Sequence, residues 1–410
     1  MPTPSETRFL NRNFVLYMVG WACTATAYFG VSAVLFNLYL VRLGFGPEFI
    51  GLLSGAGQFV WALCALPAGV FSRRFGLRTS LLVSAAGQGL GMLALLCVES
   101  LPREIWPAWL LVTWMAQWAL AAPLTVSGAP LLMQVTPLPY RRQAFTAQAI
   151  VMGIVAFLGS LLAGHLPGWL SGWVGAGLDA PAPYRTALFL IPVCYLLAFP
   201  LWSRLKLQPL GGGRAEAAEG PPRRLLLFVV GVVFLQTSAE GALRTFYNVY
   251  LDRVLLAPVD VIGQIGALAQ VVAIATALAI PRILGRLGNT LTLCVTSLGA
   301  ALAMIAIARA TSVPVAGGAF VAAMALMGIG SQARQLFSQE LVAPEHRTQI
   351  SATNSLGVGL GWATMSGVAG LLVNSLGYTG VFGIGAILAF GAAATLFGFS
   401  RRRAPAASAT

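Results

Sequence analysis

Long apolar runs separated by short polar stretches fill the sequence from end to end. A helix needs about 20 apolar residues to cross a membrane, and twelve of the runs approach or exceed that length. The pattern therefore predicts an all-α polytopic membrane protein. Its twelve expected transmembrane helices lie at residues 14–36, 48–71, 79–98, 108–132, 145–166, 186–203, 225–250, 260–284, 290–308, 314–338, 350–374 and 378–399.

Polar residues near the ends of these runs recur in the second half of the chain. Repeats at a nearly constant offset determine the architecture of a chain, and six runs fall in each copy. We predict two parallel six-helix repeats, because an even number of crossings returns the chain to the side on which it began. The recurring patches are Asn-x-Tyr-Leu-x-Arg at 37–42 and 248–253, Arg-x-Gly at 74–76 and 286–288, and Gln134, Pro139 and Arg142 against Gln339, Pro344 and Arg347, at offsets of 211, 212 and 205.

The repeat also predicts the domain boundaries. We expect an N-terminal six-helix half at residues 1–206 and a C-terminal six-helix half with a short basic tail at residues 224–410. Residues 207–223 between them are rich in Gly, Pro and Ala with mixed charge. This composition is typical of a linker without a core of its own, here a cytosolic one.

Composition and charge place these helices in a membrane and orient them. Only 9% of the 410 residues are charged, against about 25% in soluble domains, and the mean hydropathy is +0.81. Of the 25 Lys and Arg, 18 lie in the two termini and in the loops that the pattern places on the same side. Positive residues stay in the cytosol, so we expect both termini there, in a plasma membrane or a bacterial inner membrane. Residues 1–14 lack a cleavage site and are interpreted as a cytosolic tail.

Several classes of function are excluded or disfavoured by what the sequence contains. The five cysteines are scattered without paired spacing, so neither a metal site nor a disulfide framework is expected. The net charge of +13 is not carried by a soluble basic module, which argues against nucleic-acid binding. No Gly-x-x-x-x-Gly-Lys-Ser/Thr loop is present, so ATP is not the expected energy source. Two distant histidines disfavour an enzyme, and we expect a monomer in the lipid bilayer that needs no cofactor.

Taken together, the twelve helices, the parallel repeats, the central linker and Arg-x-Gly after the second and eighth helices resemble the major facilitator superfamily. The resemblance covers nearly the whole chain. In that family the loop after helix 2 usually reads Gly-x-x-x-Asp-Arg-x-Gly-Arg-Arg/Lys, and Gly69, Arg74, Gly76 and Arg78 match it here. The resemblance implies the superfamily fold and secondary transport by alternating access. It also implies gating loops, in which we place Arg74, Gly76, Arg78, Arg286 and Gly288.

Two features depart from the family pattern. The acid of the loop motif, which helps to latch the cytosolic ends of the two halves together, is Arg73 in the first copy and Gly285 in the second. The Gly-Pro signature that antiporters of the family carry in helix 5 is also missing. The resemblance therefore implies the fold, but it implies neither the usual inner latch nor drug/proton antiport.

Three charged residues are predicted inside the membrane, where a charge costs roughly 2.5–3.5 kcal/mol at a helix centre on insertion scales. Glu240 and Arg244 are four residues apart on one face of helix 7, a face that Gln236 and Tyr247 extend. One interpretation is a local ion pair that makes both charges tolerable. The other makes Glu240 a protonation site whose affinity for protons is set by desolvation and by Arg244.

The third charge is Arg334 on helix 10, near Gln335. Counted from the helix end it lies only about 8–10 Å inside the cytosolic face, so we expect no direct pair with the deeper Glu240. An arginine in an aqueous cavity suits a carboxylate or phosphate of a substrate. The alternative is that its side chain reaches the interface or the carbonyls at the helix end.

The family resemblance further implies that helices 1, 4, 7 and 10 line a central cavity. On helices 1 and 4 it assigns Trp21, Tyr28, Trp114 and Gln117 to the substrate site, although aromatic stripes at helical spacing also arise from packing alone. Aromatic and amide groups without charge in one half, and three charges in the other, favour an amphipathic organic solute.

The function that we predict is secondary active transport of a small amphipathic organic solute, coupled to protons through Glu240, with export favoured. Proton-coupled uptake of an organic anion through Arg334 and Arg244 is the alternative. A sensor of the same fold that transports nothing is a third possibility.

Overall fold

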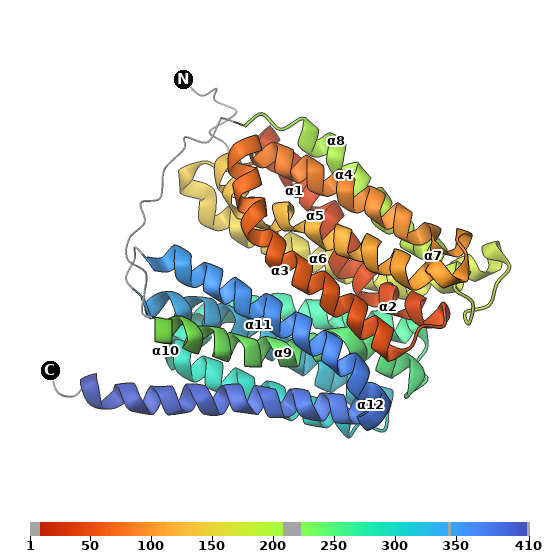
Figure 1. Cartoon of the computed structure of the whole chain (residues 1–410). Coiled ribbons are helices and arrows are strands. Elements are labelled where there is room, and N and C mark those ends of the chain that lie inside the picture. The colour runs from red at the N-terminus through yellow and green to blue at the C-terminus, as the bar shows by residue number, and fades with distance from the viewer. Residues whose placement is uncertain (1–8, 208–222, 343–345, 408–410) are drawn as a thin grey trace. The chain divides into compact units, whose positions relative to one another are not determined.

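The computed structural model describes residues 9–207, 223–342 and 346–407, and every regular element in these ranges is a helix (Figure 1). The first half begins with one long helix in three parts, α1, a π-helical segment and α2. The elements of this half are α1 (Arg12–Ala25), the π-helix (Thr26–Ser32), α2 (Ala33–Arg42), α3 (Pro47–Phe75), α4 (Leu77–Leu96), α5 (Trp106–Val135), α6 (Arg141–Val174), α7 (Ala182–Leu188) and α8 (Leu190–Ser203), with short 3₁₀ turns before α5 and α6.

The second half contains four longer helices, α9 (Arg223–Arg253), α10 (Val259–Ala308), α11 (Val313–Glu340) and α12 (Arg347–Ala407). A straight helix of 50 residues would be about 75 Å long, more than twice the thickness of the hydrocarbon layer. Non-helical backbone at Gly288 and Gly377 instead bends α10 and α12 into two arms each. Ten helices of the described chain are long and apolar enough to cross a membrane. The two bends fall between the predicted spans, and so support the prediction of twelve crossings.

The glycine of each Arg-x-Gly motif adopts a backbone conformation that other residues avoid. Gly76 has φ +88° and joins α3 to α4, and Gly288 has φ +71° where α10 bends. Glycine alone reaches this region without steric cost. The repeated motif therefore marks the same tight turn in both copies.

Some predicted helix ends were placed too early, among them the end at residue 166. The break expected after residue 166 is absent, because α6 continues through Pro167 to Val174 and carries Trp169 and Trp173 on its last turns, 63% and 92% exposed. The helix ends at Gly175, which has φ +68° and is followed by a hydrogen bond from the Ala176 N–H to the Ser171 carbonyl. Such a left-handed glycine is a common helix stop.

The chain divides into two compact units. The N-terminal unit comprises Met1–Phe45, Val60–Arg214 and Pro258–Gln270, and the C-terminal unit comprises Gly46–Phe59, Ala215–Ala257 and Val271–Thr410. Each unit thus includes the first turns of a helix that otherwise belongs to the other copy. These exchanged segments are the starts of α3 and α10, which are equivalent in the sequence repeat.

Glycines allow both exchanged segments to pack closely. In the N-terminal unit, a methyl group on Gly263 of α10 would lie 2.7 Å from the Cα atom of Gly164 in α6. In the C-terminal unit, one on Gly51 of α3 would lie 2.8 Å from Gly370 in α12. Gly51 and Gly263 are repeat equivalents. Small residues that let backbones approach are typical of helix contacts in membranes.

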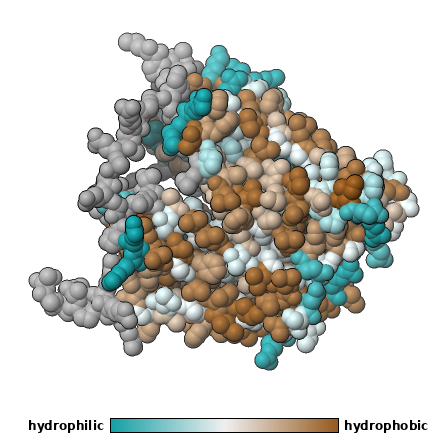
Figure 2. Space-filling view, viewed as in Figure 1, coloured by the Kyte–Doolittle hydropathy of each residue, from teal (hydrophilic) through white to brown (hydrophobic). Residues whose placement is uncertain are grey.

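The surfaces of the helices suit a lipid environment. Large apolar side chains are exposed along them, and Figure 2 shows them covering most of the visible face. Inside the N-terminal unit, Tyr17 is fully buried, donates a hydrogen bond to the Gly128 carbonyl and accepts one from Gln148. The buried hydroxyl of Tyr17 therefore has both of its hydrogen-bond partners within the same unit.

Candidate functional site

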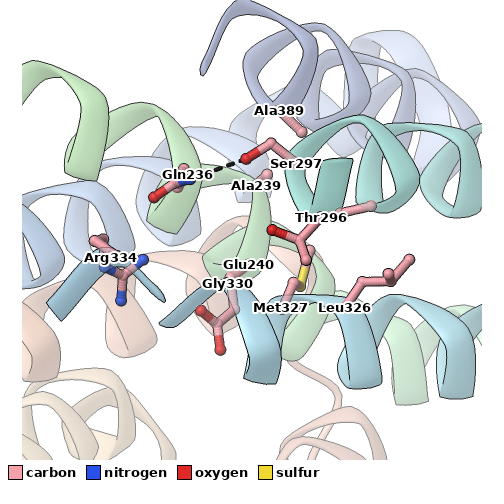
Figure 3. Close-up of a pocket in the computed structure, with 11 residues that line it drawn as sticks. Gln236, Ala239, Glu240, Thr296, Ser297, Leu326, Met327, Gly330, Arg334 and Ala389 are labelled. Carbon is pink, nitrogen blue, oxygen red and sulfur yellow. Dashed lines mark hydrogen bonds between the residues drawn. The ribbon is translucent and has the colours of Figure 1, made fainter. Parts of the chain in front are cut away.

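A small cavity lies inside the C-terminal unit, between α9, α10, α11 and α12. It offers about 30 Å³ of space to the centres of water molecules. Five polar or charged side chains come from three of the helices (Figure 3). The lining residues are Gln236, Ala239, Glu240, Thr296, Ser297, Ala300, Leu326, Met327, Gly330, Arg334 and Ala389.

Glu240 on α9 is the acid of this cavity and is only 9% exposed. Its Oε1 atom accepts a hydrogen bond from Nε of Arg244 at 2.8 Å, one helical turn further along. The local ion pair expected from the four-residue spacing is therefore present. The guanidinium of Arg244 also lies 5.7 Å from the ring centroid of Trp362 on α12, within the range of a cation–π contact.

Hydroxyl groups on the opposite side of α9 determine which face the helix turns to the cavity. Thr237 and Ser238 donate to the carbonyls of Gly357 and Gly361 on α12, at 3.4 and 3.3 Å. The two glycines leave no room for a side chain, since a methyl group on Gly361 would collide with Thr237. This close contact turns the other face of α9, with Gln236 and Glu240, into the cavity.

Gln236 links α9 to α10. Its Nε2 atom donates to the Ser297 hydroxyl at 2.9 Å, and Figure 3 shows this hydrogen bond across the cavity wall. The Oε1 atom of the same amide is buried without a hydrogen-bond partner in the part of the chain that the structure describes. A buried acceptor left in this way is costly, so it points to a ligand or a water molecule in the cavity.

Arg334 on α11 lines the same cavity as Glu240, although counting residues from the helix ends gave the two different depths. No ion pair joins the two residues within the described ranges. Counting residues from helix ends assumes upright helices, whereas membrane helices tilt by about 20° on average and an arginine side chain is long. The Nε atom of Arg334 is buried and has no hydrogen-bond acceptor among the described residues.

The predicted aromatic residues of helices 1 and 4 are packed inside the N-terminal unit. Trp114 is 8% exposed and stacks on Phe36 with ring centroids 4.0 Å apart, and its edge meets Trp118 at 6.0 Å. Tyr28 lies in the π-helix and also contacts Trp118, at 5.7 Å. Their packing is clear, and their contact with a substrate stays a prediction.

Other predicted site residues lie apart from the cavity. Trp21 stacks on Tyr17 at 6.2 Å, and Nε2 of Gln117 lies 3.6 Å from the sulfur of Met92. Gln335 is exposed and does not line the cavity. The arginines assigned to gating loops, Arg74, Arg78 and Arg286, are exposed beside Gly76 and Gly288. Arg78 donates to the Ser203 carbonyl, which ties the start of α4 to the end of α8.

Sequence reasoning missed three residues of this region: Thr296, Ser297 and Trp362. The repeat contains a signal for one of them, because Thr296 stands 212 residues after Ser84, a buried serine of the first copy. Ser297 and Trp362 carry no such signal. In the described part of the chain, no group of three or more His, Cys, Asp or Glu side chains is placed to hold a metal ion.

Comparisons with known proteins agree on one family. The profile of the Major Facilitator Superfamily matches residues 20–333 and 226–410. No curated protein sequence matches the chain significantly.

Solved structures show the same fold at low sequence identity. The nucleoside transporter NupG (D323A mutant) has a TM-score of 0.75 and 15% identity, over 95% of this chain and 99% of its own. A D-xylose-proton symporter has a TM-score of 0.73 and 13% identity, over 95% and 97%. A bacterial homologue of the human lysosomal transporter Spinster, in an inward-facing and unoccupied conformation, has a TM-score of 0.67 and 15% identity, over 97% and 96%.

Proposed function

The chain belongs to the Major Facilitator Superfamily, and on that premise we propose that it moves a small amphipathic organic solute across the membrane with protons as the coupling ion. The similar solved structures are transporters of nucleosides and of xylose with protons, and the chain is likewise a transporter rather than an enzyme. The solute and the coupling ion are the proposed part.

Glu240 is the coupling carboxyl of this proposal. The observation that supports it is a buried acid that faces a cavity with a second cation. Among the described residues, its one ion-pair partner, Arg244, lies on its own helix. A buried carboxylate is costly and can be relieved by pairing or by protonation. Glu240 has both routes available, so a change of pairing can be linked to the gain or loss of a proton.

The proposed direction and orientation of transport rest on two features of the sequence. Uncharged aromatic groups of the N-terminal unit, with Trp21, Tyr28, Trp114 and Gln117 as contacts, suit an amphipathic solute and favour export. From the positive charges of the loops we infer that both termini lie in the cytosol and that the protein lies in the plasma membrane or a bacterial inner membrane.

One observation favours a second candidate, uptake of an organic anion. Two guanidinium groups, Arg244 and Arg334, lie near one carboxylate, which leaves an excess positive charge for the carboxylate or phosphate of a solute. The sign of the transported solute separates the two candidates.

The experiment is proton flux in proteoliposomes, measured with an amphipathic cation (ethidium) and an organic anion (benzoate), for the wild type and Glu240→Gln. We expect one probe to drive proton movement in the wild type and the variant to lose it. Glu340→Gln is the matched control, because Glu340 lies at the end of α11, where it accepts a hydrogen bond from Asn289.

Coupling that survives in Glu240→Gln would reduce Glu240 to a structural partner of Arg244. Loss of coupling in the Glu340 variant alone would move the coupling site to the end of α11. Ligand-induced stabilisation of a protein that moves no solute would instead favour a sensor.

A further inference from the structure

The cavity beside Glu240 has the size and the polarity of a site for water. A water molecule requires about 10–15 Å³ of space open to its centre and two to four polar partners. The cavity offers about 30 Å³, which accommodates about two waters. This volume suits water and is too small to enclose a whole organic solute.

The unsatisfied polar atoms of the cavity match what two waters provide. Oε1 of Gln236 is a buried acceptor without a donor, and Nε of Arg334 is a buried donor without an acceptor in the described chain. The hydroxyl groups of Thr296 and Ser297 already bond within the helices or to Gln236 and keep lone pairs for a water donor. A water can therefore bond to each orphaned atom and to its neighbour.

We propose that this cavity is a water-filled proton compartment, in which ordered waters connect Glu240 to Arg334 and deliver the coupling proton. The inference rests on the proposed function, in which Glu240 is the coupling carboxyl. It adds that proton delivery needs only the C-terminal unit, because all the lining residues belong to that unit. Arg334 acts through the waters as a positioning residue for Glu240.

Among the described residues that line the cavity or pair with Glu240, the charges that face it come from two helices. Arg244 lies on the same helix, and Arg334 faces the cavity from α11. The lining residues from α10 and α12 are uncharged: Thr296, Ser297, Ala300 and Ala389. In the transfer step a hydronium ion donates a proton to a carboxylate oxygen of Glu240. One O–H bond of the hydronium breaks, one O–H bond forms on the carboxyl group, and a water molecule remains.

Filling the cavity tests the proposal. Ala300→Val and Ala389→Val each add methyl groups to its wall, and both alanines are almost fully buried. Ala301→Val is the matched control, since Ala301 is equally buried on α10 and does not line the cavity. Ethidium or benzoate exchange at equal pH requires the solute site alone, whereas accumulation driven by a pH gradient also requires the proton compartment.

We expect the two filling variants to lose about tenfold or more in proton-driven accumulation and to keep exchange within about twofold, because a positioned proton route contributes factors of this order or larger. The control variant should change neither rate. The proposal would be overturned if both filling variants accumulate solute at the wild-type level and Glu240→Gln still abolishes coupling. Glu240 would then remain the coupling carboxyl, but the cavity would not deliver its proton.

Infrared difference spectra of the purified protein between high and low pH provide a readout that needs no solute. We expect a carboxyl band of protonated Glu240 that is lost in Glu240→Gln, together with water bands that shift in H₂¹⁸O. Thr296→Val, which keeps the shape of the side chain, should weaken those water bands.

A carboxyl band without any ¹⁸O-sensitive water band would contradict the water-filled compartment. Bands that shift when chloride is added, and not when the water contains ¹⁸O, would assign the cavity to an anion. This result would also overturn the proposal of a water-filled compartment. Absence of the carboxyl band itself would refute the proposed function and not only this inference.

Discussion

The two copies of the repeat share one frame but differ in buried charge. Glu240 and Arg244 correspond to Phe29 and Ala33 at the offset of 211, and Arg334 corresponds to Ala129 at the offset of 205. All three positions are uncharged in the first copy. Apolar residues suffice for the fold at these positions, so the charges of the second copy are not required to make a six-helix unit. They are therefore the residues in which to look for function.

Equivalent tyrosines of the two copies donate hydrogen bonds to different acceptors. Tyr39 donates to Oε1 of Glu99 at 2.9 Å, and Glu99 also pairs with Arg185 at 3.2 Å. The repeat equivalent, Tyr250, donates instead to backbone carbonyls at the end of α10, that of Ala310 at 3.0 Å and that of Ile307 at 3.3 Å. Both hydroxyls therefore connect equivalent helix ends by hydrogen bonds. The acceptor is a carboxylate in the first copy and backbone carbonyls in the second.

The largest expected effect comes from introducing a buried charge into the first copy, at the position equivalent to Glu240. Phe29→Glu puts the acid of the second copy into the first, where Ala33 provides no arginine one turn away. We expect a loss of about 2.5–3.5 kcal/mol, the cost of an unpaired charge in a membrane helix. Unfolding by SDS in mixed micelles measures it. The double variant Phe29→Glu with Ala33→Arg should recover part of the loss, and no recovery would show that the local pair is not what makes Glu240 tolerable.

A smaller effect separates the two tyrosines. Tyr39→Phe removes a hydrogen bond to a charged group, worth about 1.5–3 kcal/mol, and Tyr250→Phe removes bonds to carbonyls, worth about 0.5–1.5 kcal/mol. The same unfolding assay should rank Tyr39→Phe as the more destabilised variant. Equal losses would mean that Glu99 contributes no more than a neutral acceptor.

Substitution of Gly76 and Gly288 tests whether both copies depend on the same glycine turn. Gly76 has φ +88° and ψ 156°, and Gly288 has φ +71° and ψ 167°, a region that only glycine occupies easily. Alanine at either site should cost about 1–3 kcal/mol. Gly285→Ala, at a residue of α10 with open space around it, is the control and should be nearly neutral. A neutral Gly288→Ala would show that the second Arg-x-Gly motif has lost its role as a turn.

The smallest effect concerns the cation–π contact of Arg244 in the C-terminal unit. Trp362→Leu removes the aromatic ring beside the half-exposed Arg244, and a cation–π contact at such a site contributes about 0.5–1 kcal/mol. We expect a slight loss of stability and retention of coupling in the proteoliposome assay. A loss of coupling would place Trp362 in the mechanism, as the residue that determines how Arg244 meets Glu240.

The sequence by itself predicted what depends on neighbours along the chain. Apolar runs predicted the helices, because a membrane requires about 20 apolar residues for each crossing. The recurring Arg-x-Gly predicted equivalent loops after the second and eighth helices, and the structure has a turn glycine in each, Gly76 and Gly288. The spacing of Glu240 and Arg244 predicted their ion pair, since residues four apart share one face of a helix. Each of these rules depends on neighbouring or regularly spaced residues, so the sequence alone contains all the information that the rule needs.

Only the tertiary structure decided which helices face one another. It brought Arg334 to the cavity of Glu240, added Thr296 and Ser297 to its wall and placed Trp362 beside Arg244. These meetings depend on the tilt and rotation of α9 to α12, which are determined by close contacts such as Gly361 against Thr237. Packing between helices sums many small interactions over distant residues, and no spacing within one helix records that sum.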